Sequence, residues 1–310
     1  MAKAAPIDGL DADSPLGLAA RRALAVRLAE LRALEPVVAL RCSEAADRLA
    51  PSGLSDEVEA VHDLRVATRR LRAALTLFGL GHDPARAEVN RLGDALGKVR
   101  DLDVQLAWLS SVLASGQLAP PERAGIEKLA EERRLELGPR ERALGLALSR
   151  WSEEVAPRLE QSFAELDEPG RFGGKALRRR LRKRLRRLER RLDATLASND
   201  PRTAHQLRKA TKKLRYQAEL FAPARPEAIA PLLAALEPLQ DTVGELHDRD
   251  VRAPLVERFL VRAGPSEQPG LIALLREDLA ERDRLAAELA LELRRFRSER
   301  LLHTLRAGLK

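Results

Sequence analysis

The fold of this chain is decided by a stretch of sequence that occurs twice. The segment VHDLRVATRRLRAALTLF (61–78) aligns without a gap on AHQLRKATKKLRYQAELF (204–221). Further along each copy, LGKVRDLDV (96–104) aligns on VGELHDRDV (243–251). Because the same two blocks recur in the same order at almost the same separation, we infer an internal duplication that produces two similar halves.

The composition of the chain indicates helices throughout. Leu, Ala, Arg and Glu, which all favour helix, dominate the 310 residues, whereas aromatic residues account for only 3%. Hydrophobic residues make up 45%, which is enough for a sizeable core in a chain of this length. We therefore predict an all-α fold.

Amphipathic periodicity and chain breakers divide the sequence into about four helices per half. The expected helices cover residues 16–49, 56–80, 84–113, 120 to the 150s, 175–197, 201–221, 226–262 and 270–306. Short connections between long helices are typical of antiparallel bundles, so we expect two four-helix bundles related by a pseudo-two-fold axis. The expected divisions are a flexible leader over 1–15, a first half over 16–168 and a second half over 169–310.

Glycine and proline inside these helices predict local breaks. Gly138 and Pro139 are expected to kink or end the fourth helix, and Pro238 and Gly244 to interrupt the seventh. Gly93 and Gly97 predict a looser third helix because glycine weakens a helix interior.

The repeated segment predicts one cationic and one apolar face per helix. At 100° per residue, His62, Arg65, Arg69 and Arg72 fall within roughly one quadrant. The opposite side carries Leu64, Leu71, Leu75 and Phe78, which are the candidate core. The second copy repeats the cationic spacing with His205, Arg208, Lys212 and Arg215, joined by Lys209 and Tyr216, while Arg70 and Lys213 lie at the margins.

These cationic faces predict a polyanionic ligand. Residues 175–215 hold 17 Lys and Arg against three acids, a net of +14, so a net of +8 for the whole chain leaves about −6 elsewhere. Apart from Glu219, the faces lack the acids that normally alternate with cations on an exposed helix. Arg also outnumbers Lys 46 to 9, and its planar fork matches phosphate oxygens. A linear polyphosphate would supply the missing negative charge and release counterions on binding.

In these motifs the sequence resembles the conserved histidine α-helical domain, CHAD. The resemblance rests on HDLRVATRRLR (62–72), LGKVRDLDV (96–104), HQLRKATKKLRY (205–216) and LQDTVGELHD (239–248), and it covers nearly the whole chain after residue 15. It implies two four-helix bundles flanking a basic pore that binds inorganic polyphosphate without catalysis. The E-x-E-x-K signature of the triphosphatase fused to some members is not found here.

Carried over by position, the resemblance implies a ligand-facing set drawn from both halves. That set is His62, Arg65, Arg69, Arg70, Arg72, Arg100, His205, Arg208, Lys209, Lys212, Lys213, Arg215 and Tyr216. At the position that matches Arg100, the second half has His247. Arg178 and Arg182 are further candidates because helix 175–192 surrounds a leucine stripe with arginines.

Two other functions fit part of this pattern. A single-stranded nucleic-acid binder also needs a basic face, but it stacks bases on aromatic side chains, and only Tyr216 lies on either face. A metal-dependent phosphohydrolase would use ligands such as His62 and Asp63, yet these two side chains point about 100° apart on a helix. We therefore expect no catalytic residue, no metal and no cofactor.

The remaining expectations concern the environment of the protein. Cys42 is the only cysteine, so no internal disulfide is possible, and we interpret it as a core residue. The sequence contains no apolar run of about 18 residues, so a soluble, cytoplasmic protein is predicted, with polyphosphate granules as its place of association. No membrane partner is expected, and the sequence does not specify an oligomeric state.

Overall fold

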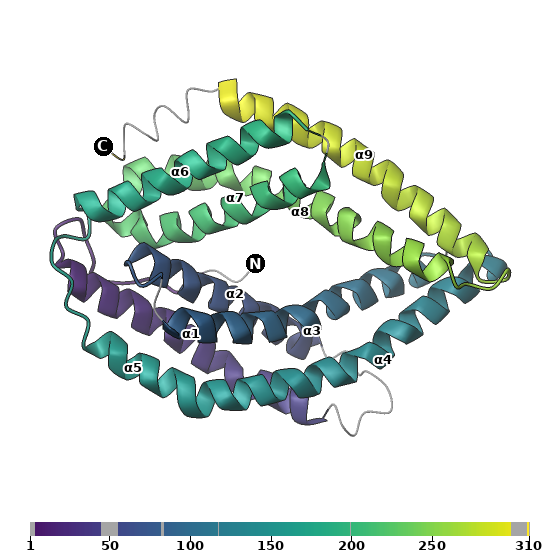
Figure 1. Cartoon of the computed structure of the whole chain (residues 1–310), viewed down its shortest axis with the longest axis horizontal. Helices are drawn as coiled ribbons and strands as arrows, with labels where there is room; N and C mark the ends of the chain where they lie inside the picture. The colour runs from purple at the N-terminus through teal and green to yellow at the C-terminus, as the bar shows by residue number, and fades with distance from the viewer. Residues whose placement is uncertain are drawn as a thin grey trace. The chain divides into compact units, whose positions relative to one another are not determined.

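The computed structural model describes residues 4–44, 55–81, 84–116, 118–198, 200–298 and 309. Within these ranges the chain is helical and has no β-strand, apart from one isolated bridge between Pro15 and Arg171. This confirms the predicted all-α class. The helices form two compact units (Figure 1): unit 1 holds residues 1–10, 14–117 and 127–171, and unit 2 holds residues 11–13, 118–126 and 172–310.

Unit 1 is a ring of packed helices. Its elements are α1 (Leu16–Glu44), α2 (Ser55–Leu77), α3 (Pro84–Ala114), most of α4 (Pro120–Arg150), a π-helical turn (Trp151–Val155) and α5 (Ala156–Ala164). Helix α2 packs between α1 and α3, while α5 contacts α1 and the π-helical turn contacts α3. Because α4, the π-helical turn and α5 follow one another without a loop, they act together as the fourth helix of the ring.

Unit 2 repeats this arrangement with α6 (Lys175–Leu196), α7 (Pro201–Phe221), α8 (Pro226–Leu260) and α9 (Gln268–Ser298). Helix α7 packs between α6 and α8, and α9 closes the ring by contacting both α8 and α6. Asp200 caps α7, because its side chain accepts a hydrogen bond of 2.8 Å from the backbone amide of Arg202. Pro201 follows at the first helical position, where its missing amide hydrogen costs nothing.

The first turns of α4 belong to unit 2 because two glycines allow a close backbone approach to α9. A Cβ atom on Gly125 would lie 1.9 Å from the carbonyl oxygen of Glu267. A Cβ atom on Gly270 would lie 1.8 Å from the carbonyl oxygen of Glu122. Both distances are far shorter than a van der Waals contact, so only glycine fits at either position.

The predicted apolar stripes form the cores. Leu64, Leu71 and Leu75 of α2 are fully buried, and so is Phe78 at 1% exposure. The α6 stripe of leucines is buried to the same degree at positions 177, 181, 185, 188 and 192. Cys42 is buried on α1, as its apolar surroundings predicted.

Unit 1 also contains a buried ion cluster. Arg41 of α1 donates two hydrogen bonds to Asp103 of α3, at 3.1 and 2.7 Å, and one of 2.7 Å to Glu141 of α4. Burial alone would lower the pKa of Arg41, but hydrogen bonds and attraction from the two carboxylates raise it above its usual value. The cluster therefore ties three helices of unit 1 together through one guanidinium group.

Several predicted breaks are wrong. Helix α4 continues through Gly138 and Pro139, and α8 continues through Pro238 and Gly244. Pro139 and Pro238 are exposed, so the carbonyl group four residues earlier, which loses its amide partner, can bind water instead. The predicted extensions of α1 over 45–49 and of α9 over 299–306 lie outside the described residues.

Residues 4–15, for which we predicted a flexible leader, make contacts with α1. The backbone amide of Ala5 donates to Glu30 at 2.7 Å, and Arg27 donates to the carbonyl oxygen of Ala5 at 2.6 Å. Ile7 and Leu10 are buried at 9% exposure each. This segment is therefore part of the packed structure. Separately, no helix in the described ranges has the length and apolarity needed to cross a bilayer.

Candidate functional site

In unit 1 the predicted cationic residues lie along the edge of α2 that meets α3. His62, Arg65, Arg69 and Arg72 are all half-buried. Arg65 donates through Nη1 to the Asp101 carboxylate at 3.3 Å, so this acid holds the guanidinium group against α3. We call this set, together with Arg100, the α2–α3 face.

Gly93 and Gly97 make room for this face rather than loosening α3, which runs unbroken through both. A Cβ atom on Gly97 would lie 3.3 Å from Nη2 of Arg65, and one on Gly93 would lie 3.5 Å from Nη1 of Arg72. The two glycines are one helical turn apart, so they form a flat strip on α3 across which two guanidinium groups lie. The sequence signal was the four-residue spacing of the glycines, from which we predicted only a looser helix.

Burial, helped by neighbouring positive charge, opposes protonation on the α2–α3 face. The pKa of His62 is lowered, first by burial and then by the positive charge of Arg100, against weaker opposing effects of Glu59 and Asp63. Burial also lowers the pKa of Arg72, and Arg69 acts in the same direction. His62 is therefore neutral at pH 7, and the permanent charge of the face is carried by arginines.

In unit 2 the corresponding face lies where α7 meets α8, and its centre is a histidine pair. The Nδ1 atoms of His205 and His247 are 3.3 Å apart, and the ring centroids are 4.7 Å apart. One imidazole must donate and the other accept, so the pair is stable when both rings are neutral. Sequence reasoning did not include His247 in the site, although its alignment with Arg100 was the signal that could have done so.

Both histidines of this pair resist protonation. Burial is the main cause for each, followed for His247 by the positive charge of Arg208 and for His205 by that of Lys209. Together these effects lower the pKa of His247 to about 3. A phosphate oxygen placed here would reverse the effect of the cations, because it stabilises the charged imidazolium.

The other predicted residues of α7 differ in their exposure. Lys209 and Lys213 are exposed, whereas Arg208 and Lys212 are half-buried. Arg215 donates to Glu219 at 2.9 Å, so part of its charge is neutralised within the helix. We call His205, Arg208, Lys209, Lys212, Arg215 and His247 the α7–α8 face.

Five predicted residues do not lie on these faces, and one of them is the exposed Lys213 of α7. Arg70 and Tyr216 are buried, at 8% and 6% exposure. Arg178 and Arg182 of α6 lie on the edge of the leucine stripe opposite to Arg184. It is Arg184, which the sequence analysis did not select, that reaches α7, where its Nε donates to Gln217 at 3.2 Å.

Near the start of the α2–α3 face, Glu59, His62 and Asp63 bring potential ligand atoms within 4.8 Å of one another. Sequence reasoning considered Asp63 but missed Glu59, which lies one turn before His62. The neutral imidazole is a suitable ligand for a divalent ion. However, Arg100 and Arg69 add positive potential at His62, which opposes the binding of a cation.

Together, fold and faces define an all-α protein of two helical units, each with a cationic face that contains histidine, together with arginine in unit 1 and with arginine and lysine in unit 2. The chain belongs to the CHAD domain family, whose sequence pattern matches residues 22–257. This confirms the resemblance inferred from the repeated motifs.

Two solved structures are similar to this chain. One is the CHAD domain from the plant Ricinus communis, with a TM-score of 0.61 and 25% sequence identity over 100% of this chain and 96% of that chain. The other is PptA from Streptomyces chartreusis, with a TM-score of 0.59 and 18% identity over 91% of this chain and 100% of that chain. The second likeness concerns the fold alone. A search of curated proteins found no match.

Proposed function

We propose that this protein binds inorganic polyphosphate without catalysing its turnover, through the α2–α3 and α7–α8 faces. The observation that carries the proposal is the repetition of a cationic helix edge in both units, with a neutral histidine among arginines in unit 1 and among arginines and lysines in unit 2. Clustered cations repel one another, and a linear polyanion relieves that repulsion and releases its own counterions.

The burial of aromatic side chains favours polyphosphate over single-stranded nucleic acid. The chain has two Trp, one Tyr and six Phe, and all nine are buried, with Trp108 the most exposed at 8%. Sequence-tolerant binding of single strands uses aromatic rings as stacking platforms. The surface of this protein offers cations for phosphates but no exposed ring for bases.

The environment of the acidic residues favours binding over hydrolysis. Asp101 contacts Arg65, and Asp250 accepts a hydrogen bond of 2.7 Å from Arg282. Both are carboxylates of the aligned motifs that a metal-dependent hydrolase would employ as ligands. Their engagement by arginine supports a role in holding cationic side chains in place.

A competition titration tests the proposal. Long-chain polyphosphate should displace a fluorescent single-stranded RNA at equal charge concentration and physiological salt, whereas RNA should displace polyphosphate poorly. If RNA displaces polyphosphate readily, the nucleic-acid alternative is favoured instead. Incubation of polyphosphate with the protein and Mg²⁺ or Mn²⁺ should release no phosphate, and release above background would favour an enzyme.

The sequence analysis also predicts that both faces contribute to one basic pore around a single polyphosphate chain. A long polyanion carries negative charge along its whole length, so one chain has enough charge for both sets of cations, which is the physical basis of that prediction. Variants of each face, described in the Discussion, distinguish a shared site from one active face. Association with polyphosphate granules in the cytoplasm would follow from the same binding.

A further inference from the structure

A second cationic surface of unit 2 lies on α6, outside the α7–α8 face. Its members are the exposed side chains of Lys175, Arg179, Lys183, Arg186, Arg187 and Arg190, which we call the α6 stripe. They fall within about 120° of helical arc, opposite the five buried leucines of the same helix. The stripe extends over most of α6, and the proposed polyphosphate faces do not include it.

The charges of the α6 stripe are not neutralised within the described part of the chain. None of its six members forms an ion pair there, whereas some exposed arginines on other helices do. Arg91 pairs with Glu88, and Arg284 pairs with Glu281 at 2.8 Å. Members of the α6 stripe that are three or four residues apart carry the same charge. Such pairs destabilise a helix by about as much as pairs of opposite charge stabilise it. The buried leucines hold this helix in place despite the repulsion.

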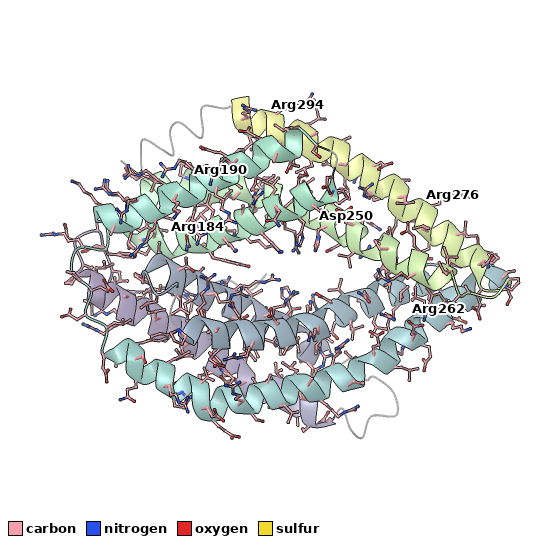
Figure 2. The ribbon with its side chains drawn as sticks, in the orientation of Figure 1. Arg184, Arg190, Asp250, Arg262, Arg276 and Arg294 are labelled. Carbon is pink, nitrogen blue, oxygen red and sulfur yellow. The ribbon has the colours of Figure 1, made fainter. Side chains whose placement is uncertain are left out.

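The α6 stripe and the α7–α8 face point in different directions. Arg184, which Figure 2 labels, marks the edge of α6 that contacts α7, because it donates a hydrogen bond to Gln217. The α6 stripe is centred about 120° around α6 from Arg184, and the cations of α7 are centred about 150° around α7 from Gln217. A short ligand on one surface therefore leaves the other surface open.

We propose that the α6 stripe is a second polyphosphate-binding surface, so that one protein molecule holds two polyphosphate segments at once. The inference rests on the proposed function of the α7–α8 face. Four of the six members are arginines, whose planar forks suit phosphate oxygens, and no exposed aromatic side chain accompanies them. With chains longer than the protein, two surfaces that face apart link several protein molecules to several chains.

The test compares binding with cross-linking. A quadruple variant, R179Q/K183Q/R187Q/R190Q, removes four charges from exposed positions and replaces them with another good helix former. Calorimetric titration with tripolyphosphate and light scattering with long-chain polyphosphate are measured on wild type and variant. We expect the variant to lose the weaker class of tripolyphosphate sites and most of its scattering, while the tighter class remains. Any binding that the variant keeps at the α6 stripe should depend less on salt. Its log–log salt slope should be shallower than that of the weaker class in the wild type by up to about three units.

The matched control, R140Q/R142Q/R258Q/R276Q, removes the same charge from exposed positions on α4, α8 and α9 (Figure 2 labels Arg276). It should scatter like the wild type. The inference is overturned if the α6 variant keeps both classes of sites and its scattering, or if the control loses scattering equally. The inference is also overturned if the α6 variant loses binding to duplex DNA but keeps its binding to polyphosphate. That result would show that the α6 stripe prefers duplex DNA. If the wild type binds no polyphosphate at all, the proposed function itself fails.

Discussion

The α2–α3 face and the α7–α8 face are built from matching sequence blocks, yet they carry their charge differently. In unit 1, Arg100 supplies a permanent charge beside His62, and two guanidinium groups lie over the glycine strip of α3. In unit 2, the position of Arg100 is taken by His247, which pairs in neutral form with His205. Arg215 is also partly neutralised by Glu219.

The difference teaches that matching sequence blocks can produce one cationic face of permanent charge and one that contains a titratable pair. The α2–α3 face should bind phosphate with an affinity that depends on salt and little on pH. The α7–α8 face should bind with an affinity that also depends on proton uptake. The predictions below compare the two units, beginning with the largest expected effect.

The aligned aspartates provide the largest contrast in stability. Asp103→Asn leaves a buried arginine partly unpaired and should reduce the free energy of unfolding by about 3–5 kcal/mol. Asp250→Asn weakens the half-exposed pair with Arg282 and should cost roughly 1 kcal/mol or less. Urea denaturation of both variants measures this. Equal losses would mean that burial does not distinguish the two aspartates.

Triple substitutions compare the two faces in binding. R65A/R69A/R72A should weaken polyphosphate binding about 100-fold, or about 3 kcal/mol, because charge-assisted hydrogen bonds are lost. R208A/K212A/R215A should weaken it less, since Glu219 already engages Arg215. Both should lower the log–log salt slope by about two units.

Equilibrium titrations over a range of salt concentrations measure these effects. Glu219→Gln is the matched control, and it should increase affinity slightly by releasing Arg215. If either triple variant binds like the wild type, that face makes no contribution, and the predicted shared site is wrong.

The histidine pair predicts a pH dependence that arises mainly in unit 2. In the free protein the pKa of His247 is about 3, and that of His205 is also lowered, mainly by burial, so both are neutral at pH 7. Bound phosphate raises both pKa values, so binding takes up protons and strengthens as pH falls from about 7 to 5. The gain should reach up to about tenfold per pH unit for each proton taken up.

Calorimetry in buffers of different ionisation enthalpy measures this proton uptake. The double variant H205Q/H247Q should lose most of it, whereas His62→Gln should lose less because Arg100 remains beside position 62. Uptake that is unchanged in the double variant would place the titrating group elsewhere.

The glycines at matching positions predict the smallest effect. Gly244→Ala should stabilise unit 2 by about 0.5–1 kcal/mol, because a Cβ there meets nothing within 4 Å and alanine favours helix. Gly97→Ala should stabilise unit 1 less, since its Cβ would press on Arg65 at 3.3 Å. Thermal unfolding of both variants, with polyphosphate titration of the second, separates the two cases. Equal stabilisation with unchanged binding would show that Arg65 does not need the glycine strip.

The sequence by itself determined the class of fold and the composition of the faces. In a helix, residues three and four apart in the sequence share one face. The order of residues along α2 therefore predicts the burial of Leu64, Leu71 and Leu75. It also predicts that Arg65, Arg69 and Arg72 share another edge. The repeat likewise predicted equivalent helices in the two units, because matching sequence has matching helix preferences.

Tertiary structure decided what lies against each edge. Arg70 and Tyr216 are buried although their helical angles place them beside the cations. The pairing of His205 with His247, and the passage of Arg65 across Gly97, join residues more than 30 positions apart. Such contacts depend on how neighbouring helices pack, which the periodicity of a single helix does not encode. The breaks predicted at the exposed prolines of α4 and α8 fail for the same reason. A helix tolerates a proline on the side that faces water, and packing decides which side that is.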